Sequence, residues 1–238
     1  MSYIHPSVVL GPGVLIGDSV TVEAGCSIGA YSVIEGDTHI GSDNRFFSHT
    51  IIGGEPQDHK FKGGGRLVIG KGNTFREFVS IHRGHLSEHG TVLGDNNMFL
   101  TGAHVGHDCV IGCNNFLANQ VMLAGHVEID NFANISGGVA VHQFCRIGSY
   151  VMISGLSGIR QDVLPYAMVQ GNPAHVIGIN KIGLQRKGFS MEQIFQIQDS
   201  YRRIRQNLEG IESPHWNELL AFQQKSERGL IKFKKVSR

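Results

Sequence analysis

The chain has 238 residues, enough for one large domain and a small second one. Its 32 glycines and only 8% aromatic residues are typical of many tight turns around a core of small aliphatic side chains. A formal net charge of +1 argues against a nucleic-acid-binding protein.

The first residues, MSYIHPSVVLGPG, show neither the charged nor the apolar region of a secretory signal. No stretch approaches the ~18 apolar residues of a membrane span. The four cysteines form no CxxC pair, which disfavours a zinc site and a disulfide framework. We therefore expect a cytoplasmic protein without an integral membrane segment.

An aliphatic or aromatic residue recurs at every sixth position through most of the chain. The period fits neither a helix, with about 3.6 residues per turn, nor the simple alternation of a strand, but it fits a short strand and a corner that repeat. Small residues often follow four positions later, and we expect Cys26, Cys109 and Cys145 in this slot to be reduced core residues. The two runs are Ile4, Leu10, Ile16, Val22, Ile28, Ile34, Ile40, Phe46 and Ile52, and then Leu93, Phe99, Val105, Ile111, Leu117, Leu123, Ile129, Ile135, Val141, Ile147, Ile153 and Ile159, with Ile177 resuming the pattern after a break at Pro165 and Gly171.

The pattern resembles the hexapeptide-repeat, left-handed parallel β-helix, in which three hexads form one coil of a triangular prism. The resemblance supplies the handedness, because most parallel crossovers are right-handed. It also implies a homotrimer with sites in the clefts between neighbouring prisms. Interruptions of the repeat predict loops near residues 53–66 and 82–91, which we expect to lie on one functional face.

Residues 180–238 lose the repeat, and we expect a small C-terminal α-helical domain after a β-helix at 1–179. Ser190 is the expected N-cap of a helix, and Pro214 is expected to end that helical region before another helix begins. The apolar face of the first helix is predicted to comprise Ile194, Ile197, Tyr201, Ile204 and Leu208. This part holds 12 Lys/Arg against 6 Asp/Glu, which fits either an acidic partner or a solvated helical surface.

The repeat also brings histidines together. His104, His107, His126 and His142 fall within five consecutive positions of an 18-residue coil, so we expect them near one corner on coils about 4.8 Å apart. His107 next to Asp108 suits a general base with a carboxylate that fixes its tautomer. Gly125, in register with His107, offers a backbone N–H for an oxyanion. A metal site and ordinary surface histidines remain the alternatives.

Several segments together are similar to the UDP-N-acetylglucosamine acyltransferases of lipid A synthesis: HVGHDCVIG, LAGHV, AVHQFCRIG, IHRG, QDHKFKG and QGNPAHVIGIN…GLQRKGFS. The similarity extends over essentially the whole chain. It implies transfer of a 3-hydroxyacyl group from acyl carrier protein to the 3-hydroxyl of UDP-N-acetylglucosamine, with neither metal nor cofactor. It also implies that His107 is the general base, Asp108 its partner and the Gly125 amide part of the oxyanion hole.

The same resemblance assigns the remaining site residues. Contacts to the sugar and phosphates are implied for Gln57, Asp58, Lys60, His82, His104 and His126, with Asp58 and Lys60 reaching across from a neighbouring chain. Nucleotide contacts are implied for His142, Gln143, Asn180 and Arg186, and control of acyl length for Gly155 and Pro173.

The chain departs from the family pattern at two positions. Ile182 stands where the family usually has an acidic residue near the nucleotide, and Pro173 replaces a residue that is commonly histidine. Arg202, Arg203 and Arg205 suit an acidic carrier protein. Three other functions stay open: N-acyl transfer to a UDP-3-amino-3-deoxy sugar, a zinc hydratase of the β-helical carbonic anhydrase type, and a trimeric scaffold without activity.

Overall fold

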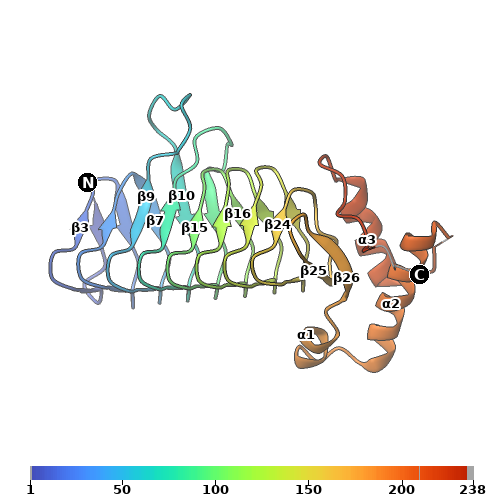
Figure 1. Cartoon of the computed structure of the whole chain (residues 1–238). Coiled ribbons are helices and arrows are strands. Elements are labelled where there is room, and N and C mark those ends of the chain that lie inside the picture. Colours follow the sequence, from blue (N-terminus) through green and yellow to red (C-terminus); the bar gives the residue numbers. More distant parts are fainter. Residues whose placement is uncertain (1, 209, 235–238) are drawn as a thin grey trace.

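The computed structural model describes residues 2–208 and 210–234. The chain winds into a prism of stacked coils, with the N-terminus at one end and three helices beyond the other end (Figure 1). Two loops, one after β9 (Ile51–Gly54) and one after β12 (Ser80–His82), project from the same side of the prism (Figure 1).

Short strands form three sheets, one for each side of the prism. The first sheet contains β1 (Tyr3–Ile4), β4 (Val20–Val22), β7 (Asp37–Ile40), β10 (Arg66–Ile69), β13 (Thr91–Leu93), β16 (Val110–Ile111), β19 (Glu128–Ile129) and β22 (Arg146–Ile147). The second contains β2 (Val9–Leu10), β5 (Ser27–Ile28), β8 (Arg45–Phe46), β11 (Thr74–Phe75), β14 (Met98–Phe99), β17 (Phe116–Leu117), β20 (Asn134–Ile135), β23 (Met152–Ile153), β25 (Ala167–Gln170) and β26 (His175–Ile179). The third contains β3 (Leu15–Ile16), β6 (Val33–Ile34), β9 (Ile51–Gly54), β12 (Ser80–His82), β15 (His104–Val105), β18 (Met122–Leu123), β21 (Ala140–Val141) and β24 (Gly158–Ile159). Apart from β25 with β26, the paired strands run parallel.

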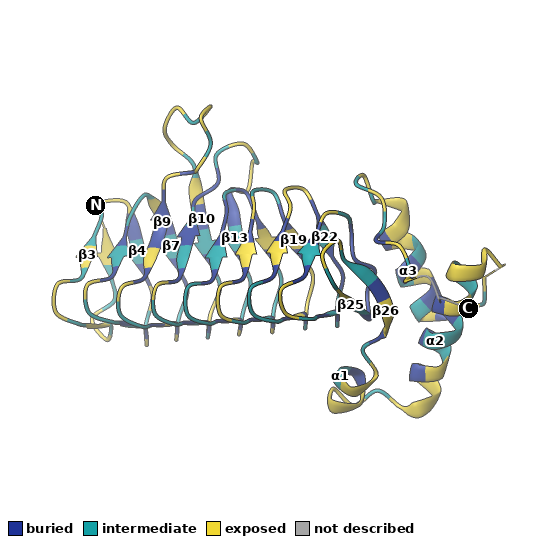
Figure 2. Cartoon of the chain, viewed as in Figure 1, coloured by how far each residue is buried: buried dark blue, intermediate teal, exposed yellow. Residues whose placement is uncertain are grey.

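From Val22 onward the repeated aliphatic residues form the core, as the sequence predicts, whereas in the first coil Leu10 is 44% exposed because the end of the prism leaves it uncovered. Leu93, Ile111 and Ile129 pair in register on successive coils, eighteen residues apart, and each is almost fully buried. Burying one such side chain stabilises the fold by about 1.5–3 kcal/mol relative to leaving it in water. Figure 2 shows the buried positions recurring along the coils, whereas the loop after β9 and the outer helix faces are mostly exposed. Cys109 and Cys145 are buried free cysteines, which confirms their expected core position.

One corner of the prism places outward-pointing residues in a column. Asp108, His126 and Phe144 occupy the same corner on three successive coils, with φ of 58°, 60° and 63°. The left-handed region is uncommon for residues other than glycine, and the coil imposes it at each corner. The rings of His126 and Phe144 stack with centroids 4.5 Å apart. Residues separated by one coil therefore become neighbours at this corner.

The two interruptions of the repeat are loops, as predicted, and one buried arginine ties them together. The first loop connects β9, which ends at Gly54, to β10, and the second connects β12 to β13. Arg83 in the second loop donates to the carbonyls of Gly53 at 2.8 Å and Gly64 at 3.0 Å in the first. Its guanidinium also lies 5.3 Å from the ring centre of Phe61. Both ends of the first loop are thus held by the second.

The repeat does not resume at Ile177, so this prediction was wrong. After β24 the first side of the prism is continued only by a parallel bridge of Val163 to Ile147, β25 then pairs parallel to β23, and β26 folds back antiparallel onto β25. Ile177 lies in β26 and is 39% exposed. An aliphatic residue in the right phase does not extend a solenoid once the chain has reversed direction.

Three helices follow the last strand: α1 (Lys181–Arg186), α2 (Met191–Gln206) and α3 (Pro214–Gln224). Ser190 caps α2 in a capping box with Gln193, which confirms the expected N-cap. Tyr201 of α2 is buried and donates to the carbonyl of Pro165 at 2.5 Å. None of the helices within residues 2–208 and 210–234 has the length and apolar character needed to cross a bilayer.

Two details at the helix ends differ from expectation. Pro214 is the first residue of α3, after the N-cap Ser213, because proline at this position has no N–H to leave unpaired. Helix α2 ends earlier, where Asn207 adopts a left-handed conformation, and Leu208 beyond it is 49% exposed. Residues 235–238 of the predicted helical domain lie outside the described residues, and its independence as a domain stays a prediction.

A column of buried asparagines satisfies backbone groups that such short strands leave unpaired. At each step one Oδ1 accepts from a backbone N–H of the next coil at 2.8 Å, and the last acceptor serves Ala133. Side-chain amides in the column donate to corner carbonyls. The column consists of Asn44, Asn73, Asn97 and Asn115.

Replacing Asn97 with alanine should destabilise the prism, because it leaves the Asn115 N–H and the Gly112 carbonyl without partners. We expect the free energy of unfolding to fall by about 1–3 kcal/mol in a urea titration. Asn134, an exposed strand residue, is the matched control, and Asn134→Ala should change little. Equal losses in the two variants would contradict the role of the column.

Candidate active site

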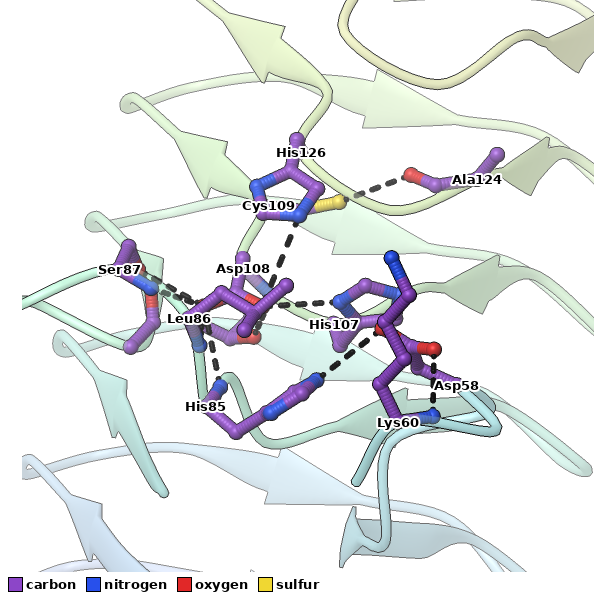
Figure 3. Close-up of polar contacts among 12 residues, drawn as sticks. Asp58, Lys60, His85, Leu86, Ser87, His107, Asp108, Cys109, Ala124 and His126 are labelled. Atoms are coloured by element: carbon purple, nitrogen blue, oxygen red, sulfur yellow. Dashed lines mark hydrogen bonds and ion pairs between the residues drawn. The ribbon is translucent and has the colours of Figure 1, made fainter. Parts of the chain in front are cut away.

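His107 and Asp108 lie together at the corner that follows β15 (Figure 3). The Nδ1 atom of His107 is 2.8 Å from Oδ2 of Asp108, and the carboxylate is buried. A carboxylate accepts only, so the shared proton belongs to Nδ1 and leaves Nε2 of neutral His107 with its lone pair. The pair therefore has the arrangement of an imidazole base oriented by a carboxylate.

The second oxygen of Asp108 organises the loop between β12 and β13. Its Oδ1 accepts from three consecutive backbone N–H groups, those of His85, Leu86 and Ser87, at 3.0, 3.0 and 2.8 Å. The Ser87 hydroxyl donates to the same oxygen at 2.9 Å. Burial alone raises the pKa of Asp108, but the Ser87 N–H and the His107 ring outweigh it and hold the pKa well below its usual range. Asp108 is thus a permanently charged anchor for the loop and for His107.

The backbone of Gly125 passes directly beside the His107 ring. A Cβ at this position would lie 2.7 Å from both Cε1 and Nε2 of His107, closer than real side chains approach. Among the described residues, none accepts a hydrogen bond from the Gly125 N–H. Glycine is required here by the close approach, and its amide is a donor available next to the basic nitrogen.

Three further predicted histidines line the same face. The rings of His107 and His126 lie edge to face at 5.2 Å, and those of His82 and His104 do so at 5.1 Å. Nδ1 of His104 is 2.8 Å from the Ser80 hydroxyl. Burial lowers the pKa of His104 to about 4, and burial also lowers the pKa values of His82 and His126. These three side chains are therefore neutral near pH 7 and act as hydrogen-bonding groups.

The loop between β9 and β10 brings Asp58 to this cluster. Its Oδ2 lies 3.4 Å from Nε2 of His85, and its Oδ1 accepts from the backbone N–H of Lys60 at 2.9 Å. Gln57 and Lys60 are exposed on the same loop. Asp58 thus reaches His85 of its own chain, and its service to a neighbouring chain stays a prediction.

The predicted nucleotide residues are not joined to this cluster by contacts within the described chain. His142 and Gln143 are exposed at the corner two coils away, and Arg186 is exposed in the last turn of α1. Asn180 is engaged in the fold itself: its side chain caps α1 through the Gly183 N–H and donates to the Tyr150 carbonyl at 2.9 Å. Binding by these four residues stays a prediction.

The two predicted acyl-length residues are both exposed. Gly155 lies at a corner where a Cβ would meet the Gly137 carbonyl at 3.3 Å, and Pro173 lies between β25 and β26. Their role in setting the acyl length stays a prediction.

Sequence reasoning missed His85, Ser87 and Ser80. The side chain of His85 packs between Asp58 and His107, with its ring centre 5.5 Å from that of His107. The loop HRGHLSEHG was recognisable as an interruption of the repeat. His85, a further histidine within it, was a sequence signal of a site residue. Its contacts depend on how the loop folds around Asp108, which the hexapeptide repeat does not encode.

His85, His107 and Asp108 form a group whose possible metal-ligating atoms lie within 4.8 Å of one another. The two oxygens of Asp108 are already engaged, Oδ1 by four donors and Oδ2 by His107. Zinc ligands must converge at about 2.1 Å from one point, so coordination would break these bonds. The residues present fit proton transfer better than a metal.

Comparisons with known proteins agree with this arrangement. Residues 162–231 match the family model described as "Udp N-acetylglucosamine O-acyltransferase; Domain 2". Two relatives named acyl-[acyl-carrier-protein]–UDP-N-acetylglucosamine O-acyltransferase are similar over 87% of the chain. The one from Sinorhizobium fredii is 40% identical with 82% of its length covered, and the one from Burkholderia orbicola is 45% identical with 84% covered.

Solved structures extend the likeness to the fold. A UDP-N-acetylglucosamine acyltransferase from Francisella novicida has a TM-score of 0.88 at 33% identity, covering 97% of this chain and 92% of the other. The corresponding protein from Bacteroides fragilis has a TM-score of 0.83 at 38% identity, covering 97% and 98%. Mirror-image solenoids do not superpose, so these coils wind in the same sense, in agreement with the left-handed β-helix expected of the family.

Fold and site together define a β-helical acyltransferase. The relatives from Sinorhizobium fredii and Burkholderia orbicola are 40% and 45% identical to this chain over most of both lengths, and this similarity establishes the family. The chain belongs to the acyl-[acyl-carrier-protein]–UDP-N-acetylglucosamine O-acyltransferase family.

The lowered pKa of His104 predicts a loss of stability in mild acid. Between pH 6.5 and about 4 the unfolded chain binds a proton at this residue that the folded chain does not, so stability falls as the pH decreases through this window. His82 and His126 contribute with the same sign. Urea midpoints should therefore decline less steeply over this range in His104→Gln than in the unchanged protein, and identical slopes would contradict the assignment.

Proposed function

We propose that this protein transfers a 3-hydroxyacyl chain from acyl carrier protein to the 3-hydroxyl of UDP-N-acetylglucosamine, the first step of lipid A synthesis. The observation that carries the proposal is the His107–Asp108 pair beside the bare amide of Gly125. Membership of the family supplies the substrates, since the relatives are named for them.

The geometry supports a direct transfer with His107 as the general base. Nε2 takes the proton of the sugar 3-hydroxyl as its oxygen attacks the thioester carbon, which forms a tetrahedral oxyanion. The Gly125 N–H donates to that oxyanion. Asp108 stabilises the imidazolium, which returns the proton to the leaving thiolate when the carbon–sulfur bond breaks. This direct transfer needs no acyl-enzyme. The neighbouring thiol of Cys109 is unsuited as a nucleophile, because it is buried and burial raises its pKa to about 12.

The sugar is proposed to lie between the histidine face and the first loop. Nδ1 of His82 is buried and has no hydrogen-bond partner among the described residues, so a ligand hydroxyl or phosphate would satisfy it. Neutral His104 and His126 add donors and acceptors on the same face. Asp58, with Gln57 and Lys60, covers it from the loop.

The remaining substrate groups are proposed to follow the prism toward the helices. His142, Gln143, Asn180 and Arg186 would contact the nucleotide, with Ile182 removing an acidic ribose contact. Gly155 leaves a corner without a side chain, as an acyl groove requires, and Pro173 would border it. These assignments rest on the family resemblance and on the exposure of most of these residues.

We also propose a homotrimer and a carrier-protein surface on residues 180–238. Arg202 and Arg205 of α2 are exposed, which suits an acidic partner. Arg202 and Arg203 pair with Asp199, so part of this charge is compensated within the helix.

The direct test is an acyl-transfer assay on protein treated with a chelator, with UDP-N-acetylglucosamine and its 3-amino analogue offered in parallel. We expect turnover of the hydroxyl sugar, and a loss of kcat of about 10²–10⁴-fold in His107→Ala with the oligomeric state intact. Turnover of the amino sugar alone would move the protein to N-acyl transfer. Turnover of neither sugar would reopen the zinc hydratase and the inactive scaffold, and a silent His107→Ala would contradict the base.

Gly125→Ala tests the close approach beside the base. The added methyl group meets the His107 ring at 2.7 Å, so the ring must move from its position against Asp108. A displacement of about 1 Å costs roughly 10²-fold in rate, and we expect kcat to fall by that order. Gly178→Ala is the matched control, because a Cβ there meets nothing within 4 Å. Unchanged kcat in Gly125→Ala would contradict the proposed role.

A further inference from the structure

His85 links the two projecting loops to the catalytic pair, and neither the family resemblance nor the sequence pattern assigns it a role. It lies in the loop between β12 and β13, and its side chain is only 7% exposed. Its ring is within 5.5 Å of the His107 ring, centre to centre, and its Nε2 is near Asp58 of the other loop (Figure 3).

The backbone of His85 is held where it is. Its N–H is one of the three consecutive amides that donate to Asp108. The loop closes at a narrow neck, where a Cβ on Gly84 would meet the backbone of Gly90 at 2.6 Å and Oδ1 of Asp108 at the same distance. The start of the His85 side chain is therefore fixed relative to the catalytic pair and does not shift independently of it.

The ring of His85 is also fixed in direction. Phe61 packs against it edge to face with centroids 5.3 Å apart, and the tilted ring of His107 lies 5.5 Å from it. Its Nε2 is buried and has no hydrogen-bond partner among the described residues. Oδ2 of Asp58, at 3.4 Å, is within ion-pair distance but not aligned as a hydrogen bond. A small movement of Asp58 would complete the bond and satisfy a buried polar atom.

Asp58 needs such a support. Arg83 holds the two ends of its loop at Gly53 and Gly64, but the tip carrying Asp58 is exposed over most of its length. Besides His85, the polar side-chain contacts of Asp58 among the described residues are with the Lys60 N–H and with His59, whose own side chain is 88% exposed. His85 is the buried group that ties this carboxylate to the rest of the site.

We propose that His85 is a positioning residue that holds the Asp58 carboxylate over the sugar site through its buried Nε2. Since His85 is itself anchored on Asp108, the sugar-binding loop and the general base keep a fixed relative position. The inference rests on the proposed function, because Asp58 is assigned there to the sugar. It predicts that His85 acts on acceptor binding and acts through Asp58.

The test is a double-mutant cycle on the full-length protein with 3-hydroxyacyl carrier protein and UDP-N-acetylglucosamine. The variants are His85→Ala, His85→Gln, Asp58→Ala and the His85→Ala/Asp58→Ala double variant, each measured for kcat and KM of the sugar. His59→Ala is the matched control, since it removes an exposed histidine near the same carboxylate. Melting temperatures monitor the fold, and glutamine retains a side-chain N–H donor at a similar reach.

We expect His85→Ala to raise KM about tenfold with little change in kcat, as for loss of one hydrogen bond to a charged group. His85→Gln should restore most of the KM, His59→Ala should leave it unchanged, and His85→Ala should add nothing in the Asp58→Ala background. An unchanged KM, a KM rise that persists in that background, or failure of glutamine to restore KM in a folded protein would each overturn the inference. Failure of the proposed function is distinct, because the unchanged protein would then not turn over the sugar at all, and the inference would fall with it.

Discussion

The carboxylate of Asp108 is the constraint on which the site depends. It is a buried charge at a prism corner, and such a charge is costly unless it is fully hydrogen-bonded. Four donors from one loop converge on Oδ1, and His107 takes Oδ2. The same residue therefore folds the loop between β12 and β13 and sets the tautomer of the neighbouring imidazole. One carboxylate thus holds both the loop and His107, so a substitution of Asp108 changes both.

The solenoid explains why the site forms where it does. Each coil returns a residue to the same corner, and in-register pairing stacks Asp108, His126 and Phe144 in one column. Next to that column the Gly125 backbone touches the His107 ring because no side chain intervenes. Residues that are eighteen positions apart thereby reach contact distance without any specialised loop. The rigid core of stacked aliphatic residues holds these positions.

The fold was predictable because the repeat is strictly periodic. A buried aliphatic residue at every sixth position predicts the strands, the corners and the clustering of His107 with His126, all of which the structure contains. The prediction failed where the chain leaves the regular repeat. Ile177 keeps the phase but lies in a reversed strand, and Pro214 begins a helix although proline more often signals an end. The contacts of His85 depend on a folded loop, which no repeat describes.

The family resemblance and the geometry contribute different parts of the account. Relatives name the substrates, while the contacts show which nitrogen of His107 faces Asp108 and why Gly125 has no side chain. The proposed role of His85 comes from neither source. The His85 N–H donates to buried Asp108, and this hydrogen bond places the His85 ring against the Asp58 loop. Asp108 and the Asp58 loop are thus linked through one histidine, by a hydrogen bond on one side and by close approach on the other.

The central claim is that Asp108 holds His107 with its proton on Nδ1 and its lone pair on Nε2. Two-dimensional NMR of protein labelled with ¹⁵N-histidine, assigned by comparison with His107→Gln, measures this tautomer directly. In the neutral form of His107 we predict a protonated Nδ1 and a bare Nε2 in the unchanged protein, with the preference lost in Asp108→Ala. A proton on Nε2 of neutral His107 in the unchanged protein would contradict the account.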